Sequence, residues 1–422
     1  MPAGMVESVV DQKFTASEIS PINSWSILSQ TDHSKNTINP VRRIVENCTV
    51  TPNPEKSVIK FHLGDPTVGG ELPPSPVAIQ AIKDSVTSLS SNGYFPATGS
   101  PVARQAIVDR FSTETAPFTS DDVILTSGCS HALQISIEAI ANKGDNILVP
   151  SPGFPHYSTL CRSSQVIDKA YLVEINGEDM HINLPYLESI IDDNTKAIII
   201  NNPGNPSGGV FTKEHLEEIL EVAEKFKLII IADEIYGDIV FNGAIFYPIA
   251  SLTPKVPVIT CDGLAKRWMV PGWRLGWIIV HNRFGVLSDV KKGIVNLTQK
   301  IVGACSLVQG ALPKILMETP EEYFEHSRNL IKTNADIVIK ILQDVSGVTV
   351  IKPKGAMYMM LRISGCDANF CQELVREESV FCLPGQVFAA PGYIRIVLTL
   401  NKEVMEQAAN RIREFCLRKN GN

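Results

Sequence analysis

Short apolar runs that alternate with amphipathic stretches dominate the middle of this chain. Between about residues 120 and 280 the runs are DVILTSG, DNILVPS, KAIIINNPGNP, KLIIIADEIYG, PVITCDGLAK and RLGWIIV. Stretches such as TKEHLEEILEVAEKF separate them, with apolar residues at helical spacing and acids near the start. Continuous β-branched runs are typical of strands that are buried on both faces. The alternation therefore predicts an α/β fold with a mostly parallel sheet between two layers of helices.

The character of the sequence changes after about residue 315. The stretch EEYFEHSRNLIKTNADIVIKILQDV predicts a long helix, and GVTVIKP, GAMYMMLRI, SVFCLPG and YIRIVLTL predict strands separated by turns. A last helix is expected from about 402 to 418, which gives a smaller α+β domain. We predict four parts of the chain: a mobile N-terminal arm (1–37), a segment that joins the small domain (38–75), a large domain (76–315) and a small C-terminal domain (316–422).

Composition and charge exclude several classes of protein. Hydrophobic residues make up 44% and charged residues 20%, and no apolar run reaches the roughly 18 residues of a membrane span. The net charge of −7 and the lack of a basic block argue against a nucleic-acid partner. Nine scattered cysteines without a C-x-x-C pair favour reduced thiols and offer no metal site. Because the first residues, MPAGMVESVVDQKF, resemble no targeting signal, we expect a cytoplasmic protein.

Polar residues follow several of the apolar runs. In an open parallel sheet, ligands bind outside the carboxyl ends of the strands, so these residues are the first candidates for a site. Asp233 and Tyr236 follow KLIII, Asn205 follows KAIII, and Lys266 follows PVITCDG. Each also has an ordinary structural explanation, because an acid can cap a turn, a lysine can keep its head in water, and Asn-Pro-Gly can form a simple turn.

A further run ends in Ser127, Gly128 and Cys129, just before an expected helix. Backbone N–H groups at a helix N-terminus, with a hydroxyl beside them, suit a phosphate, although an ordinary N-cap is the alternative. Together with Arg274, the lysine and the aspartate, these groups match pyridoxal phosphate. That cofactor needs a lysine Schiff base, an acid for its pyridinium nitrogen and anion-binding groups. The nucleotide-binding motifs G-x-G-x-x-G and G-x-x-x-x-G-K-[ST] do not occur.

Ten stretches of the chain carry a resemblance to a known family. They are NPVRRIVENC, LGDPTVGGELP, NGYFPATGSP, ILTSGCS, PSPGFPHY, NNPGNPSG, ADEIYGD, GLAKRWMVPGWRLGW, GAMYMM and YIRIV. In this order, from about residue 38 to the C-terminus, they resemble the fold-type-I pyridoxal-phosphate-dependent aminotransferases, and most closely the branch that acts on tyrosine. The resemblance implies a large domain with a mostly parallel seven-stranded sheet and a smaller α+β domain.

The resemblance also implies roles for the residues around the cofactor ring. Lys266 would hold pyridoxal phosphate as a Schiff base and later move the proton at the substrate Cα. Asp233 would pair with the pyridine nitrogen, and Tyr236 and Asn205 would hydrogen-bond the phenolic oxygen of the ring. Phe154 would stack on the ring face.

Other matched residues would bind the phosphate and the substrate. The phosphate would be held by Ser127, the N–H groups of Gly128 and Cys129, and Arg274. Tyr94 would reach the phosphate of a neighbouring subunit, which implies a homodimer with shared active sites. Arg395 would clamp the α-carboxylate of the substrate, with Asn205 beside it, and Gly64 would let the backbone approach that carboxylate. One departure is Gly263, where many family members have a serine that contacts the phosphate.

Several other residues are left outside this site. We interpret Trp268, Trp273 and Trp277 as packing residues and residues 357–360 as a strand, although the resemblance implies that GAMYMM lies near the substrate cleft. His131 and His156 could equally be core or site residues.

The expected activity is a ping-pong transamination. An L-amino acid, tyrosine or phenylalanine, would give its amino group to a 2-oxo acid such as 2-oxoglutarate or pyruvate. Alternatives that share the same motifs are a preference for alanine, methionine or kynurenine, and a C–S lyase. A non-catalytic, cofactor-binding regulator is disfavoured because the N-terminal arm has no helix-turn-helix pattern and the catalytic residues occur together.

Overall fold

The computed structural model describes residues 28–46, 49–67, 69–176 and 179–419. Its main sheet has eight strands in the order β2-β9-β8-β7-β6-β3-β4-β5. Neighbours from β8 to β4 are parallel, β9 is antiparallel to both β2 and β8, and β5 is antiparallel to β4. The strands are β2 Val123–Thr126, β3 Asn146–Ser151, β4 Ile167–Asn176, β5 Asp179–Ile182, β6 Thr195–Asn201, β7 Ile229–Asp233, β8 Val258–Gly263 and β9 Gly276–His281. The predicted α/β class is confirmed.

The number of strands in the main sheet differs from the seven that the resemblance implied. The additional strand is β5, which turns back from β4 and pairs Ile182 with Val173 at the edge of the sheet. Only alternate residues of β5 are buried, and Asp179 and His181 point away from the core. Such a short edge strand has no continuous apolar run, so its sequence resembles a loop.

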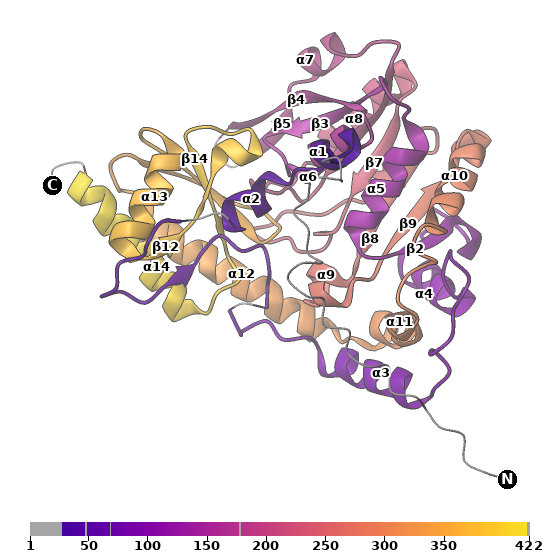
Figure 1. The fold of residues 1–422 in the computed structure, drawn as a ribbon, viewed down its shortest axis with the longest axis horizontal. Coiled ribbons are helices and arrows are strands. Elements are labelled where there is room, and N and C mark those ends of the chain that lie inside the picture. Colours follow the sequence, from indigo (N-terminus) through magenta and orange to yellow (C-terminus); the bar gives the residue numbers. More distant parts are fainter. Residues whose placement is uncertain (1–27, 47–48, 68, 177–178, 420–422) are drawn as a thin grey trace, which may run out of the picture.

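Helices cover both faces of the main sheet (Figure 1). They are α3 Pro76–Thr87, α4 Pro101–Phe111, α5 Cys129–Ile140, α6 His156–Ser163, α7 Leu184–Ser189, α8 Lys213–Phe226, α9 Leu264–Arg267, α10 Ser288–Thr298 and α11 Ser306–Glu318. Within β6, Ile198 and Ile200 join the core cluster that contains the apolar side chains of α8. Ala197 and Ile199 join the cluster that contains those of α5 and α6. Because consecutive side chains of a strand point to opposite faces, the sheet is buried on both sides, as the β-branched runs predicted.

A third core cluster lies where α3, α4 and α11 pack on β2 and β9. Trp268 and Trp277 are fully buried in it, and Trp273 packs against it. The interpretation of these tryptophans as packing residues is therefore confirmed.

The C-terminal part contains a four-stranded antiparallel sheet in the order β10-β11-β14-β13. Its elements are β10 Val348–Ile351, β11 Tyr358–Ile363, β12 Val380–Phe381, β13 Leu383–Pro384, β14 Tyr393–Val397, α12 Glu321–Leu342, α13 Asp367–Glu378 and α14 Lys402–Lys419. The strand β1 (Ile59–Lys60) pairs in parallel with β12, so the chain before residue 76 lies beside the C-terminal part. The long helix, the strands and the last helix predicted from the sequence are all present.

The start of the described chain contains two short helices, α1 (Asp32–Asn36) and α2 (Pro40–Glu46). Of the arm predicted for residues 1–37, residues 1–27 lie outside the described residues. His33 of α1 lies close to α6, because its Nδ1 is 2.8 Å from the carbonyl oxygen of Ser163. The end of the predicted arm is therefore a helix that contacts the large sheet's covering layer.

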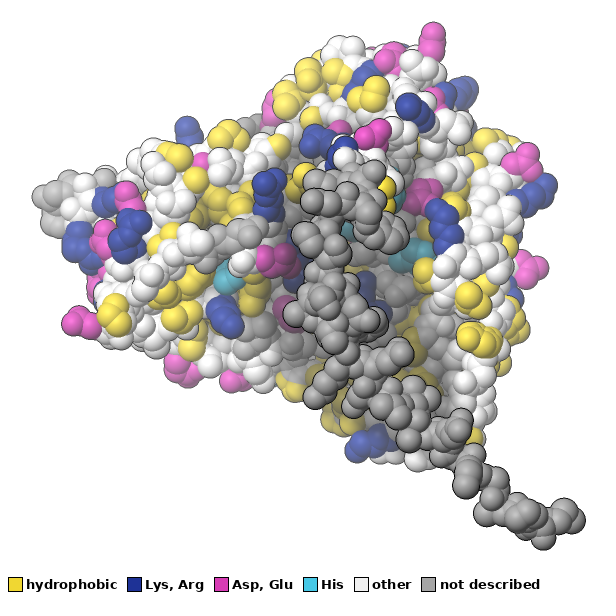
Figure 2. Space-filling model, in the orientation of Figure 1, with side chains coloured by type: hydrophobic (Ala, Val, Ile, Leu, Met, Phe, Trp, Pro, Cys, Tyr) yellow, Lys and Arg dark blue, Asp and Glu magenta, His cyan; other side chains and the backbone are white. Residues whose placement is uncertain are grey.

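The predicted boundary between the large and the small domain, after residue 315, falls inside the continuous helix α11. In the described ranges, no helix is long and apolar enough to cross a membrane, and no cluster of side chains has the make-up of a metal site. On the face shown in Figure 2, basic and acidic side chains are interspersed, with apolar ones scattered between them. Short 3₁₀ turns lie at Ser120–Asp122, Ile249–Leu252, Pro271–Trp273, Arg283–Gly285 and Gly385–Phe388.

Candidate active site

Most of the predicted site residues lie at one edge of the main sheet. Asp233 is the last residue of β7, Lys266 lies in α9 directly after β8, and Asn205 is in the loop after β6. Phe154 follows β3, and Ser127 follows β2. These strands run in the same direction, so their carboxyl ends meet at a common edge. The topology therefore gathers residues that are up to 139 positions apart in the chain (from 127 to 266).

Asp233 is a buried carboxylate that is held by neutral donors. Its Oδ2 accepts a hydrogen bond from Tyr157 Oη at 2.6 Å, and its Oδ1 accepts from Cys129 Sγ at 3.6 Å and from the N–H of Ile235 at 3.3 Å. Burial raises the pKa of Asp233, and these donors, with the nearby charge of Lys266, oppose that rise. Among the described residues, no basic side chain forms an ion pair with it. A pyridinium N–H would supply the missing cationic donor.

Lys266 is half-buried, and its Nζ donates a hydrogen bond to the carbonyl oxygen of Gly64 at 2.5 Å. Gly64 is also the point where the chain passes close to Tyr358. A Cβ added at Gly64 would lie 2.7 Å from the Tyr358 hydroxyl oxygen, which is closer than two such atoms normally approach. The absence of a side chain at Gly64 therefore keeps the lysine, the backbone carbonyl and the phenol together.

Tyr236 lies in the loop after β7 and contacts Tyr358 of β11. The two hydroxyl oxygens are 3.0 Å apart, and the rings meet edge to face at 81° with centroids 5.7 Å apart. Both side chains are buried. Burial and the neighbouring phenol raise the pKa of Tyr236 well above its usual value. The strand predicted for this stretch is present, with Tyr358 as the first residue of β11, whereas its contact with Tyr236 was not predicted from the sequence.

Arg395 of β14 is a buried cation that lacks an acidic partner among the described residues. Its Nη1 donates to Asn205 Oδ1 at 3.1 Å, and its Nη2 donates to the carbonyl oxygen of His62 at 2.8 Å. The guanidinium lies over the rings of Tyr358 and Phe388, at 4.2 and 4.7 Å from their centroids. Among the described residues, the Nε of Arg395 has no hydrogen-bond partner. Burial lowers the pKa of the Arg395 guanidinium. A carboxylate would neutralise the positive charge of Arg395 and accept hydrogen bonds from its guanidinium.

An anion-binding arrangement lies at the N-terminus of α5. Gly128 is the N-cap residue and has a φ of +81°, a left-handed conformation that favours glycine. Arg274 reaches across from the 3₁₀ turn before β9, and its Nη2 donates to the carbonyl oxygen of Ser127 at 3.1 Å. A Cβ at Gly128 would lie 2.5 Å from that Nη2. The helix N-terminus, the Ser127 backbone and the guanidinium therefore lie together, an arrangement that suits one phosphate.

The glycine that departs from the family pattern has a structural explanation. At Gly263 the backbone is extended, so its conformation does not require glycine. The lack of space at this position does favour glycine, because an added Cβ would lie 2.7 Å from the carbonyl oxygen of Leu275 and 2.8 Å from the Cα of Gly276 on the adjacent strand. The neighbouring side chains act elsewhere: Asp262 pairs with Arg267, and the thiol of Cys261 meets Ser136. A serine at residue 263 would therefore force the backbone at the start of β9 to shift.

Not every predicted residue is drawn into this group. Tyr94 is 89% exposed and lies outside it. Phe154 packs edge to face on Tyr157, with centroids 5.7 Å apart. His131 accepts a hydrogen bond from the N–H of Ser127, whereas both ring nitrogens of His156 are buried without a partner.

Sequence reasoning missed three side chains, Tyr157, Tyr358 and His62. Tyr157 lies within the quoted stretch PSPGFPHY, and His62 precedes LGDP. Burial lowers the pKa of His62 to about 4, so its imidazole is neutral where its carbonyl holds Arg395. The available signal was that Tyr157 and Tyr358 lie in matched stretches and His62 lies directly before one, but the partner of each side chain lies far away in the sequence.

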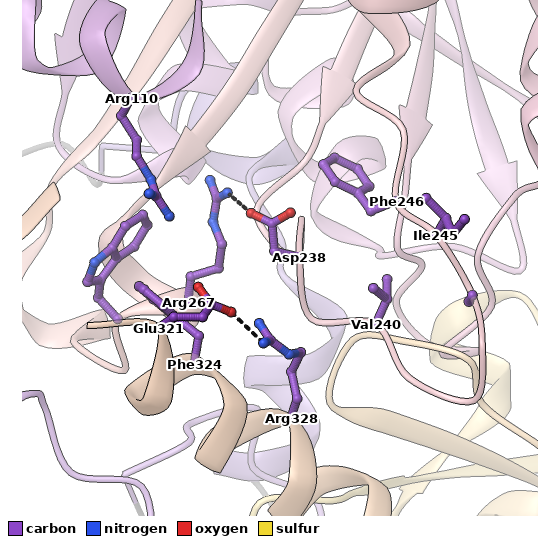
Figure 3. Close-up of a pocket in the computed structure, with 11 residues that line it drawn as sticks. Arg110, Asp238, Val240, Ile245, Phe246, Arg267, Glu321, Phe324 and Arg328 are labelled. Atoms are coloured by element: carbon purple, nitrogen blue, oxygen red, sulfur yellow. Dashed lines mark hydrogen bonds and ion pairs between the residues drawn. The ribbon is translucent and has the colours of Figure 1, made fainter. Parts of the chain in front are cut away.

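A cavity of about 420 Å³ lies next to the site but has a different chemistry. It is lined by Arg267, the residue after Lys266, and by residues of α4, α12 and the loop after β7 (Figure 3). Four of its charged side chains form pairs, Arg267 with Asp238 at 3.1 Å and Arg328 with Glu321 at 2.5 Å, and Arg110 also lines it. None of the predicted site residues lines it, so we place the active site at Lys266 and Asp233.

Comparisons with known proteins identify the class. Residues 56–412 match the family model "Aminotransferase class I and II", and the chain belongs to this family. Its members are pyridoxal-phosphate-dependent enzymes that transfer an amino group between an amino acid and a 2-oxo acid.

Within this family, the chain is similar to several tyrosine aminotransferases. The chain is 68% identical over 400 residues to the tyrosine aminotransferase of Caenorhabditis elegans, covering 94% of this chain and 86% of the relative. It is 44% identical over 400 residues to the tyrosine aminotransferase of Homo sapiens, covering 93% and 88%. Among solved structures it is similar to the tyrosine aminotransferase of Leishmania infantum, with a TM-score of 0.89, 32% identity and coverage of 94% and 99%.

The residues at the edge of the sheet fit pyridoxal phosphate. Asp233 lacks a cationic partner, and the N-terminus of α5 with Arg274 forms an anion-binding arrangement. Within the part of the chain that the structure describes, the hydrogen-bond acceptor of Lys266 is a backbone carbonyl, so its amine can be released for covalent attachment. The three groups that the cofactor requires are therefore present at one edge of one sheet.

Proposed function

We propose that this chain transfers the amino group of L-tyrosine and L-phenylalanine to a 2-oxo acid such as 2-oxoglutarate or pyruvate. The observation that carries the proposal is Arg395, a buried guanidinium that has no acidic partner among the residues the structure describes. It donates a hydrogen bond to Asn205, and it lies over the ring of Tyr358, whose hydroxyl contacts Tyr236. An amino acid offers the carboxylate that this cation lacks. The choice of aromatic substrates is supported by the names of the relatives, of which the nematode tyrosine aminotransferase is 68% identical.

The chain's own residues would first bind and orient the substrate. Arg395 would clamp the α-carboxylate through its planar guanidinium, and Asn205 and the rings beneath it would fix the direction of that clamp. Gly64 has no side chain to obstruct the approach of the carboxylate to the backbone. A substrate held in this way presents its Cα hydrogen to the same region as the Lys266 amine, which lowers the entropic barrier to proton transfer.

The remaining residues would hold the cofactor and move the proton. When bound, pyridoxal phosphate supplies an electron sink for the carbanion at the substrate Cα. Asp233 would hold a proton at the ring nitrogen, Tyr236 would donate to the phenolic oxygen, and the α5 N-terminus with Arg274 would bind the phosphate. Lys266 Nζ, once free, would take the proton from the substrate Cα and hold it for delivery on the other side of the amino nitrogen.

The proposal is tested by comparing substrates with the purified holoenzyme. Initial rates are measured for L-tyrosine, L-phenylalanine, L-alanine, L-methionine and L-cysteine with either 2-oxoglutarate or pyruvate, and both oxo-acid products and ammonia are quantified. The two aromatic donors should give the highest kcat/KM, without release of ammonia. A higher kcat/KM for alanine or methionine would contradict the aromatic preference. Ammonia and pyruvate formed from cysteine would indicate a lyase instead.

We also propose that the protein is a homodimer in which Tyr94 reaches the phosphate site of the partner subunit. The support is its 89% exposure, which is unusual for a tyrosine that has a function within its own subunit. The test mixes two inactive variants, Lys266→Ala and Tyr94→Ala, after reversible dissociation. A mixed dimer contains one intact site, so about a quarter of the wild-type activity should return. No recovery, with dimers confirmed by light scattering, would contradict shared sites.

A further inference from the structure

Tyr358 is a buried phenol that contacts several of the proposed active-site residues at once. It is the first residue of β11 and is only 2% exposed. Its hydroxyl oxygen is 3.0 Å from that of Tyr236, and its ring centroid is 4.2 Å from the guanidinium carbon of Arg395. One side chain therefore connects the tyrosine expected beside the cofactor ring with the arginine expected beside the substrate carboxylate.

The position of Tyr358 depends on its surroundings. A Cβ at Gly64 would lie 2.7 Å from its hydroxyl oxygen, so glycine there makes room for the phenol. The same glycine accepts a hydrogen bond from Lys266 through its carbonyl oxygen. In the strand pairing, Tyr358 lies opposite Val397, two residues from Arg395 on β14. The phenol is thus fixed by a sheet from one side and by a close backbone approach from the other.

The direction of the hydrogen bond between the two phenols follows from counting protons. Each hydroxyl has one proton to donate. If Tyr236 donates its proton to the phenolic oxygen of the cofactor ring, it has none left for Tyr358. Tyr358 must then donate to Tyr236. A hydroxyl that accepts a hydrogen bond is a stronger donor, because bonds in a chain polarise one another.

The charges around the two phenols favour the same direction. Burial raises the pKa of Tyr358, but the positive charges of Lys266 and Arg395 lower it. The pKa of Tyr236 is raised by burial and by its neighbour. The more acidic phenol is the better donor, and here it is Tyr358.

We propose that Tyr358 is a positioning residue with two actions: its hydroxyl directs the Tyr236 proton toward the cofactor ring, and its ring face supports the Arg395 guanidinium. The first action rests on the role proposed for Tyr236. The second rests on the stacking of Arg395 between the rings of Tyr358 and Phe388.

The experiment separates the two actions with two substitutions in the holoenzyme. Tyr358→Phe removes the hydroxyl and keeps the ring, and Tyr358→Leu removes both. The first readout is the pH at which the visible absorbance of the bound cofactor changes, with Tyr236→Phe as the reference variant. Tyr358→Phe should shift this pH in the same direction as Tyr236→Phe and by less. The second readout is KM, which should rise for every amino acid in Tyr358→Leu and by much less in Tyr358→Phe.

Three results would overturn the proposal. If Tyr236→Phe shifts the absorbance transition and Tyr358→Phe leaves it at the wild-type pH, the hydroxyl has no part in directing the proton. If neither variant shifts it, the role of Tyr236 fails, and the first action fails with it. If KM in Tyr358→Leu, with a wild-type circular dichroism spectrum, equals that of the wild type, the ring does not support Arg395. Neither of the first two results affects the amino-donor preference, which the substrate comparison tests separately.

Discussion

Replacing Gly263 by serine would restore the residue that many family members have, yet we expect it to destabilise this protein. The serine Cβ would lie 2.7 Å from the carbonyl oxygen of Leu275 and 2.8 Å from the Cα of Gly276. Both neighbours are backbone atoms, which cannot rotate out of the way as a flexible side chain can. The Leu275 carbonyl also accepts a hydrogen bond from the N–H of Leu264 at 3.1 Å, so moving it would disturb the start of α9.

The expected loss follows from these two contacts. Overpacking in a well-packed region costs about 1–3 kcal/mol, and weakening one buried hydrogen bond adds about 1 kcal/mol, which gives a loss of about 2–4 kcal/mol in the free energy of unfolding. The assay is urea denaturation at one fixed protein concentration, followed by circular dichroism, with cofactor affinity measured by fluorescence quenching. Because α9 carries Lys266, the affinity for the cofactor should also fall despite the added hydroxyl.

A matched control is available at Gly272, six residues after Lys266. This glycine is exposed, and an added Cβ there would meet no atom within 4 Å. Gly272→Ser should therefore change the free energy of unfolding by no more than about 0.5 kcal/mol. A Gly263→Ser protein as stable as Gly272→Ser, with cofactor bound more tightly than in the wild type, would refute the reasoning.

Three other outcomes are expected. Lys266→Ala should reduce turnover by about 10²–10⁴-fold or more while the urea midpoint stays close to that of the wild type, since one proton-transfer group is lost; near-normal transamination would contradict its role. Arg395→Ala should lower kcat/KM by an amount equivalent to about 2–5 kcal/mol for every amino acid, whereas a loss confined to one substrate would mean that it reads side chains. Burial lowers the pKa of His156 to about 4. The contribution of its neutral imidazole to the free energy of unfolding should therefore be fully present above pH 6.5 and should be lost as the pH falls from 6.5 to 4. His156→Phe should therefore flatten the pH dependence of the urea midpoint in that range; Glu234, whose pKa burial raises to about 7, changes stability in the opposite sense in both proteins.

The strands of the main sheet could be predicted because buried strands have a recognisable local sequence, a short run of apolar residues. The runs before Asp233 and Lys266 are rich in β-branched residues, since β7 and β8 have neighbours on both sides and helices on both faces. The edge strand β5 has no such signal. Its residues Asp179 and His181 are polar, and it forms because β4 lies beside it rather than because of its own composition.

The site could be predicted only where a residue type is unusual in its local setting. A lysine or an aspartate directly after a buried run indicates a functional site, because a charged group is costly to bury there. Lys266 and Asp233 do lie at one edge of the sheet. Tyr358 gives no such signal, because an aromatic residue is ordinary in a strand. Its contact with Tyr236 joins residues 122 positions apart, and only the packing of the two sheets reveals it.

The most direct test of the central claim uses one half of the reaction. The purified holoenzyme is mixed with L-tyrosine in the absence of any oxo acid, while the visible absorbance of the cofactor, 4-hydroxyphenylpyruvate and ammonia are followed together. The account predicts bleaching of the absorbance with one 4-hydroxyphenylpyruvate formed per site, no ammonia, and recovery of the absorbance when 2-oxoglutarate or pyruvate is added. An unchanged absorbance with no oxo acid formed, or continuous release of ammonia, would contradict it.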